Sequence, residues 1–285
     1  MNAKKWTALL LALTLIFSLA ACSGGTASAT PTPSAAPTAT PTATPAADDD
    51  LSYVLKNGKM LIGYTVYEPM NYTDKDGKFT GFDTEFAEAV CAKLGVKAEF
   101  VEINWDTKVI ELDSKSIDCI WNGMTITDEL KQNISISDPY VKNMQVVVIR
   151  SKDAGTYTST TSLVKANLVA EAGSAGENVI KSDADLSKAN YISVSKQTDA
   201  LMEVKAGTSD AAVLDWTLAK SMVGEGTDYA DLQMISGVEL SVEKYGIGFR
   251  KDSTLCTKVN EIMAGLIADG TLGALAEKYG LSLAQ

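Results

Sequence analysis

The chain has 285 residues, 46% of them hydrophobic, and its 36 acidic against 25 basic side chains give a formal net charge of −11. This acidic balance argues against nucleic acid or an anionic surface as a partner. The chain has no histidine, and its four cysteines show no metal-type spacing, so we expect neither a metal nor another cofactor.

The first 21 residues have the pattern of a signal peptide. Lys4 and Lys5 precede an apolar run from about Ala8 to Ala20, which is short for a bilayer span. The following Leu-Ala-Ala-Cys sequence resembles the lipobox of bacterial lipoproteins, in which the cysteine is lipidated and becomes the new N-terminus. Cys22 is therefore the expected lipidation site, carrying acyl chains such as palmitate that would anchor the protein outside the cytoplasm on the cell membrane. The alternative is an ordinary cleaved signal with a chance cysteine.

Residues 22–50 are expected to form a tether between the lipid and a folded part. Positions 23–50 are nearly all Ser, Thr, Ala, Gly and Pro and contain five of the seven prolines. Such a composition cannot bury a hydrophobic core. The remaining residues, 51–285, suffice for two modest lobes or one large domain.

The folded part alternates strand and helix patterns. Its first half predicts a strand at 59–65, a hairpin at 74–82, a helix at 82–94 ended by Gly95, a strand at 98–103, a short helix at 106–114, a buried strand at 117–121 and a helix beginning at Thr127. The second half predicts strands at 144–150, 167–171, 191–195, 210–215 and 244–250, with helices beginning near 174, 197, 216, 255 and 271. Alternating strands and helices imply parallel sheets with covered faces, and ligands bind at the carboxyl ends of such strands.

Several motifs occur in the order found in one protein family. They are "GKFTGFDTEFAEAVCAKLGV", "IDCIWNGMTITDEL", "SDPY", "AGSAGENVI", "DAAVLD" and the long segment from "YGIGFRKD" to "LAEKYG". Over residues 51–285 the chain resembles the bacterial extracellular solute-binding proteins of family 3, the polar amino-acid receptors of ABC importers.

The resemblance implies an α/β, two-lobe periplasmic-binding-protein-like fold. Each lobe would be a mainly parallel sheet flanked by helices, and two crossing strands near 140–144 and 241–245 would join the lobes. Lobe 1 would comprise 51–140 and 246–285, and lobe 2 would comprise 145–240. A ligand would be trapped when the lobes close about this hinge.

The same resemblance assigns aromatic residues to the site. Tyr67 and Trp105 match two aromatic positions that sandwich the ligand's side chain, although both could instead be surface or core aromatics. Tyr64 occupies a position where several members of the family have an aspartate that contacts the ligand. Trp121 could pack in the core or form the rim of the cleft.

Polar groups are assigned in the same way. The backbone of Asn122 and Gly123 would accept from the ligand's ammonium, Thr125 would hold its carboxylate, and the turn at Ser174 and Ala175 would be a second anion site. Asp215 would pair with the ammonium; as an alternative, it caps the helix that follows it.

Leu130 departs from the family pattern. The motif T-x-T-x-E-R carries an arginine that grips the ligand's carboxylate, whereas this chain has leucine there. Neither arginine of the chain, Arg150 or Arg250, is an obvious replacement, and Lys131 points about 100° away along a helix. Removing the cation from a buried charge pair costs roughly 2–5 kcal/mol. Either the carboxylate is held by amides and Thr125 alone, or the ligand lacks one and Leu130 contacts an apolar part of it; a third possibility is a receptor that binds little.

The expected function is capture of an amino acid or related small amine for delivery to ABC permease subunits, by a monomer. The alternatives are a ligand sensor without transport and a dehydratase-like enzyme, for which Asp215, Glu171 and the tyrosines would be the candidate acids or bases. Cys91, Cys119 and Cys256 are expected to be buried small residues, with one disulfide possible.

Overall fold

The computed structural model describes residues 49–284. The predicted signal peptide, the lipidation site Cys22 and most of the predicted tether lie outside this range. The tether prediction extends slightly too far, because helix α1 (Asp50–Asn57) begins within it, with the side chain of Asp49 capping the helix at Ser52 N. Among residues 49–284, no helix has the length and apolar character needed to cross a membrane.

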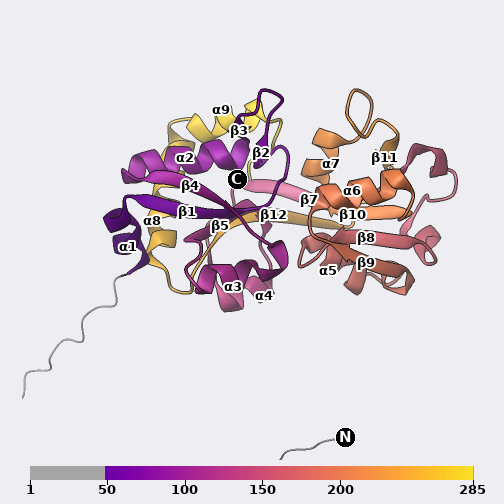
Figure 1. The fold of residues 1–285 in the computed structure, drawn as a ribbon, viewed down its shortest axis with the longest axis horizontal. Coiled ribbons are helices and arrows are strands. Elements are labelled where there is room, and N and C mark those ends of the chain that lie inside the picture. The colour runs from indigo at the N-terminus through magenta and orange to yellow at the C-terminus, as the bar shows by residue number, and fades with distance from the viewer. Residues whose placement is uncertain (1–48, 285) are drawn as a thin grey trace, which may run out of the picture. The chain divides into compact units, whose positions relative to one another are not determined.

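A mixed β-sheet runs through the described part of the chain. Its main strands follow the spatial order β4-β1-β5-β12-β7-β10-β8-β9 (Figure 1). In chain order the strands are β1 (Lys59–Tyr64), β4 (Lys97–Glu102), β5 (Cys119–Thr125), β7 (Val141–Arg150), β8 (Asn167–Glu171), β9 (Asn190–Val194), β10 (Ala211–Asp215) and β12 (Ser241–Phe249). The short strands β6 (Ser135–Ile136) and β11 (Leu232–Met234) add to β12 and β7, and β2 (Tyr72–Thr73) forms a separate hairpin with β3 (Phe79–Thr80).

The pairing pattern divides this sheet into two halves. In one half β1 pairs in parallel with β4 and β5, and in the other β8 pairs in parallel with β9 and β10. Between them β7 and β12 run antiparallel, with Ser241 opposite Gln145 and Tyr245 opposite Val141. The predicted two-lobe fold with two crossing strands is therefore confirmed. The crossing strands also bond to both halves, so the two expected sheets form one continuous curled sheet.

Helices cover both faces of each half. In the first half they are α2 (Phe82–Leu94), α3 (Lys108–Asp113), α4 (Asp128–Asn133), α8 (Thr254–Ala268) and α9 (Thr271–Lys278). In the second half they are α5 (Ala175–Ser182), α6 (Gln197–Ala206) and α7 (Trp216–Met222). Figure 1 shows α6 and α7 on one side of the β8–β10 strands and α5 on the other. Gly95 ends α2 with a left-handed φ of 74°, a conformation that glycine adopts without strain.

The first half is tied together by a buried arginine. Arg250 is 9% exposed; its guanidinium donates to Asp50, to Asp118 and to the carbonyls of Leu112 and Ile117. This residue therefore joins α1, the end of α3 and the segment that leads into β5.

Three cysteines lie within residues 49–284. Cys91, Cys119 and Cys256 are buried free thiols, so the disulfide left open by the sequence does not form among the described residues.

Candidate functional site

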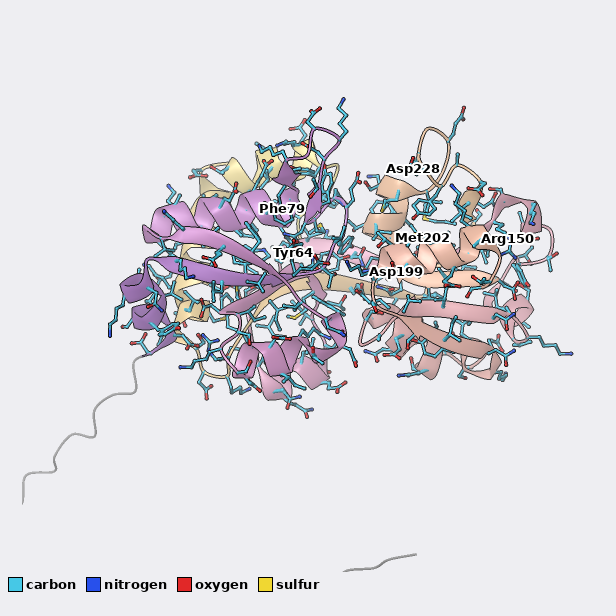
Figure 2. All side chains as sticks on the ribbon, viewed as in Figure 1. Tyr64, Phe79, Arg150, Asp199, Met202 and Asp228 are labelled. Carbon is cyan, nitrogen blue, oxygen red and sulfur yellow. The ribbon has the colours of Figure 1, made fainter. Side chains whose placement is uncertain are left out.

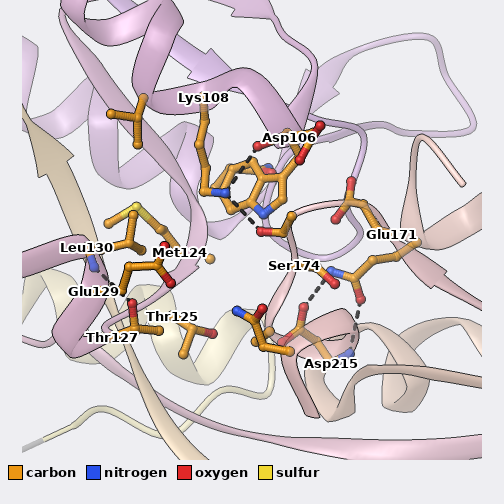
Figure 3. Close-up of a pocket in the computed structure, with 18 of the residues that line it drawn as sticks. Asp106, Lys108, Met124, Thr125, Thr127, Glu129, Leu130, Glu171, Ser174 and Asp215 are labelled. Atoms are coloured by element: carbon orange, nitrogen blue, oxygen red, sulfur yellow. Dashed lines mark hydrogen bonds between the residues drawn. The ribbon is translucent and has the colours of Figure 1, made fainter. Parts of the chain in front are cut away.

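A cavity of about 340 Å³ lies where the carboxyl ends of β5, β8 and β10 meet α3, α4 and α5 (Figure 3). Its size is in the range of small-molecule sites. The lining comprises Trp105, Asp106, Lys108, Val109, Asn122, Gly123, Met124, Thr125, Thr127, Glu129, Leu130, Asn133, Glu171, Gly173, Ser174, Ala175, Asn178, Gln197 and Asp215. The polar groups predicted after β5 (Asn122, Gly123 and Thr125) and after β8 (Ser174 and Ala175) thus line the same cavity.

One wall consists of a short 3₁₀ turn, Trp105–Thr107, and the start of α3. Asn104 fixes the turn by accepting from the backbone N–H of Asp106 at 3.0 Å. Lys108 follows, 8% exposed, with its Nζ 4.9 Å from the centre of the Trp105 ring. This Nζ donates to the carbonyl of Trp105 at 3.1 Å and, across the cavity, to the carbonyl of Gly173 at 2.9 Å. Burial lowers the pKa of Lys108, and nearby Glu171 opposes that effect.

The second wall is the turn that opens α4. Thr127 caps this helix by accepting from the backbone N–H of Leu130 at 3.1 Å, and Thr125 and Leu130 both line the cavity. Lys131 is not in the lining; it pairs with Asp128 at 3.2 Å and is largely exposed. The position of the missing family arginine therefore faces the cavity as an apolar side chain (Figure 3).

A buried acid supports this wall from behind. Asp83 is completely buried, and its Oδ2 accepts from the backbone N–H of Gly123 at 2.7 Å and from the hydroxyl of Tyr140 at 2.9 Å. Burial raises the pKa of Asp83 to about 7. The side chain of Asn122 is also used internally, since it bonds to the backbone and hydroxyl of Thr65. The role that the sequence predicted is therefore left to backbone carbonyls of Asn122 and Gly123.

The third wall is the turn from β8 into α5. Gly173 has a left-handed φ of 69°, and the Oγ of Ser174 accepts from the N–H of Glu177 at 3.1 Å. The carboxylate of Glu177 in turn accepts from the N–H of Gly173 at 2.7 Å. Gly176 packs closely behind the turn: a Cβ added there would lie 2.5 Å from the carbonyl oxygen of Val213. Ser174 and Ala175 thus present the helix start to the cavity on a firmly held turn.

Asp215 lies at the end of β10 inside a network of amides. Its Oδ1 accepts from Asn143 at 2.5 Å and from Gln145 at 2.7 Å, and its Oδ2 accepts from Gln197. The same two amides from β7 also donate to Glu243 on β12, at 2.6 and 2.8 Å. Burial and the neighbouring Glu243 raise the pKa of Asp215 well above its ordinary value.

The capping alternative for Asp215 is only half correct. Asp215 occupies the N-cap position of α7, but its side chain makes no capping hydrogen bond. Instead, the Oδ1 of Asn143 accepts from the backbone N–H of Thr217 at 3.2 Å. The carboxylate of Asp215 is thus directed toward the amide network.

Glu171 ends β8 beside Asp215 and also lines the cavity. It is 2% exposed, and its Oε1 is buried without any hydrogen-bond partner among the described residues. Burial raises the pKa of Glu171 to about 8, and the charge of Asp215 adds to this effect.

Three aromatic residues lie outside the lining. Tyr64, the last residue of β1, packs against Phe79 with ring centres 4.8 Å apart (Figure 2). Tyr67 is 2% exposed; its ring lies against Gly123 and its hydroxyl is 2.6 Å from that of Tyr245. Trp121 is fully buried, with its ring edge-on to Phe86 at 4.8 Å, so it is a core residue. Of the predicted aromatic residues, Trp105 lines the cavity directly.

The comparison with protein families decides the identity. The family described as bacterial extracellular solute-binding proteins, family 3, matches residues 60–282. The chain belongs to this family. Its members are extracytoplasmic binding proteins, in agreement with the resemblance inferred from the motifs.

Individual relatives cover most of the chain. The L-cystine-binding protein TcyJ of Escherichia coli K12 is 29% identical over 231 residues, which is 80% of this chain and 85% of TcyJ. A mutant of ArgBP from T. maritima is 32% identical with a TM-score of 0.74, covering 81% of this chain and 98% of that one. The ancestral amino acid-binding protein AncCDT-1, a precursor of cyclohexadienyl dehydratase, is 31% identical with a TM-score of 0.72, covering 80% and 98%.

The charges in the lining define what this member of the family can hold. Four acids line the cavity: Asp106, Glu129, Glu171 and Asp215. Lys108 is the only cationic side chain in that lining. Within residues 49–284, no three side chains of the metal-ligating types come together to hold a metal ion. The arrangement can therefore bind a small polar molecule.

Proposed function

We propose that this protein is the substrate-binding component of an ABC importer and captures an amino acid or a related small amine. The observation that carries the proposal is the cavity of about 340 Å³, whose acidic lining comes from both halves of the sheet. Relatives such as TcyJ, whose name says that it binds L-cystine, support transport of a small nitrogen-containing solute. In this proposal lobe 1 is 51–140 with 246–285, lobe 2 is 145–240, and closure about the crossing strands retains the ligand.

The residues proposed to contact the ligand come from both lobes. Trp105, Thr125 and Leu130 would contact it from lobe 1, together with backbone groups of Asn122 and Gly123. Ser174 and Ala175 would contact it from lobe 2. Tyr67 and Asp215 would hold the contacting groups in position. Tyr64 would contact the ligand at the edge of the cavity if the lobes move. Lys108, which no sequence pattern indicated, is the cation nearest to a ligand carboxylate, although two carbonyls already accept from it.

Lipidation at Cys22 would keep the binding lobes close to the permease. The sequence supports this by the Leu-Ala-Ala-Cys pattern followed by a tether to about residue 48. A chain with two or more acyl groups is anchored stably, whereas one acyl group alone gives only reversible binding. We also propose that the protein acts as a monomer. Mass spectrometry of the purified membrane form tests the anchor: a Cys22→Ala variant should lose the added acyl mass and appear in the soluble fraction.

Binding without turnover is the proposed activity. Because the chain is similar to AncCDT-1, a dehydratase is the competing hypothesis. Such an enzyme could use Glu171 as an acid, because the pKa of Glu171 is about 8. A ligand receptor uses the same group only to bind. Incubation of the purified protein with candidate carboxylic acids, followed by product analysis, distinguishes the two, and release of a dehydrated product would overturn the proposal.

The ligand panel is the direct test of function. We expect the purified full-length chain to show a raised melting temperature with at least one compound among L-arginine, L-lysine, L-histidine, L-tyrosine and their decarboxylated forms agmatine, cadaverine, histamine and tyramine. A ligand sensor would bind in the same way, so uptake by cells with and without the gene separates transport from sensing. Absence of any shift across the panel would refute the proposed ligand class.

A further inference from the structure

We propose that Glu171, and not Asp215, is the acceptor for the positively charged group of the ligand, an alkylammonium or guanidinium. This inference rests on the proposed function and specifies which carboxylate of the cavity binds the cation. Both residues end neighbouring parallel strands, β8 and β10, so both face the same end of the cavity (Figure 3). The two residues differ in their hydrogen bonding.

Asp215 already has its donors. Amide groups of Asn143, Gln145 and Gln197 donate to its two oxygens, and the first two also bridge to Glu243. These donors come from β7 and α6, and the second acid comes from β12, so the network links the crossing strands to lobe 2. A carboxylate that is held by three amides fixes the position of this part of the cavity wall. A ligand cation would have to displace or crowd amides that are themselves buried.

Glu171 has the opposite environment. Neither oxygen of its carboxylate accepts a hydrogen bond from a described residue; Oε1 is buried, and the residue lines the cavity. Buried polar atoms without partners are rare because each one costs about 1–3 kcal/mol. A ligand N–H directed at this carboxylate would provide the missing partner, and a cationic donor would also compensate the charge of its ionised form.

The charged side chains that act on Glu171 are compatible with its role as the acceptor for the ligand's cation. Lys108 on α3 acts on it from lobe 1, but the hydrogen bonds of its Nζ among the described residues go to the carbonyls of Trp105 and Gly173. Lys196 and Asp199, at the start of α6, and Asp215 on β10 complete the set. Lys196 is paired with Glu102. Among the described residues, neither lysine therefore donates a hydrogen bond to Glu171.

Binding at Glu171 has a proton signature. Burial holds the pKa of Glu171 at about 8, so roughly nine-tenths of the free protein carries a proton on this group at pH 7. A cationic ligand requires the ionised form, and binding must therefore release about 0.9 proton at pH 7. Affinity for the amine should rise about 50-fold from pH 6 to pH 8, most steeply below pH 7, and then level off until the amine itself deprotonates near pH 10.

Isothermal titration calorimetry of the purified full-length chain tests this. The tightest binder of the eight compounds named above is titrated at pH 7 in phosphate and in Tris, whose different ionisation enthalpies reveal the protons released. For the wild type we expect about 0.9 proton released, and for Glu171→Gln we expect essentially none, with at least about tenfold weaker binding. Glu88→Gln, which removes one exposed acid from α2, is the matched control.

The outcomes separate the two proposals. If Glu171→Gln keeps the wild-type affinity, or still releases the proton, the assignment to Glu171 is wrong while the binding function stands. If the wild type binds none of the eight compounds, both are wrong. Should Glu171→Gln fail to fold, the proton count of the wild type decides alone, since a value near zero overturns the inference.

Discussion

Asp83→Asn probes the buried acid that supports the cavity wall. The folded protein holds the pKa of Asp83 at about 7 against an ordinary value of 3.8, because burial outweighs the two hydrogen bonds to its Oδ2. The folded state therefore binds this proton more tightly than the unfolded state does, and stability must fall as the pH rises from 3.8 to 7. Each pH unit in this interval costs about 1.4 kcal/mol.

The size of the effect follows from these values. Between pH 5 and pH 8 the wild-type chain should lose roughly 3 kcal/mol of unfolding free energy through Asp83 alone. An asparagine amide oxygen can still accept from the N–H of Gly123 and from the hydroxyl of Tyr140, and it has no proton to lose. The variant should therefore gain roughly 3 kcal/mol relative to wild type on going from pH 5 to pH 8, whatever the pH-independent effect of the substitution.

Urea unfolding of wild type and variant at the two pH values, followed by tryptophan fluorescence, measures this double difference. Asp76→Asn, at an exposed position in the turn between β2 and β3, controls for removal of one charge. An unchanged difference between Asp83→Asn and wild type at pH 5 and pH 8 would refute the statement that the folded protein retains this proton.

Three further substitutions test other parts of the structure. Leu130→Arg places a guanidinium where the cavity lining now has an apolar side chain, so L-arginine should gain at least about tenfold in calorimetric affinity relative to agmatine; an unchanged ratio would show that position 130 does not reach the ligand. Arg250→Met leaves the buried Asp118 without its cation and should lower the urea-unfolding free energy by about 3–5 kcal/mol, whereas a loss below about 1 kcal/mol would contradict a structural role. Gly176→Ala drives a Cβ against the carbonyl of Val213 and should lower the melting temperature, with Gly155→Ala as the control because nothing lies within 4 Å of a Cβ there.

Local sequence signals predicted much of the fold correctly. The Asp-Gly turn, the glycine after α2 and the threonine before α4 each act within a few residues, and the structure has the hairpin, the helix end and the Thr127 cap. Helix α1 was missed because its first residue lies in an acidic stretch that continues a proline-rich segment. Its helical cap depends on a single side chain, that of Asp49.

The site was less predictable because its decisive contacts join distant positions. Lys108 follows Trp105 by three residues, but its importance comes from Gly173, 65 positions later in the chain. The sequence likewise gave no sign that amides from Asn143 and Gln145 bridge Asp215 to Glu243. An acid at a strand end is visible in a sequence, whereas the number of donors that reach it depends on tertiary packing.

The central claim is that this cavity selects its ligand by positive charge and lacks the guanidinium that grips a carboxylate in the family motif. Calorimetric titration of the purified wild-type chain with L-arginine and with agmatine isolates that point, since the two compounds differ only in the carboxylate. We predict that agmatine binds at least as tightly as L-arginine. L-Arginine binding 30-fold more tightly, a difference of about 2 kcal/mol, would contradict the claim.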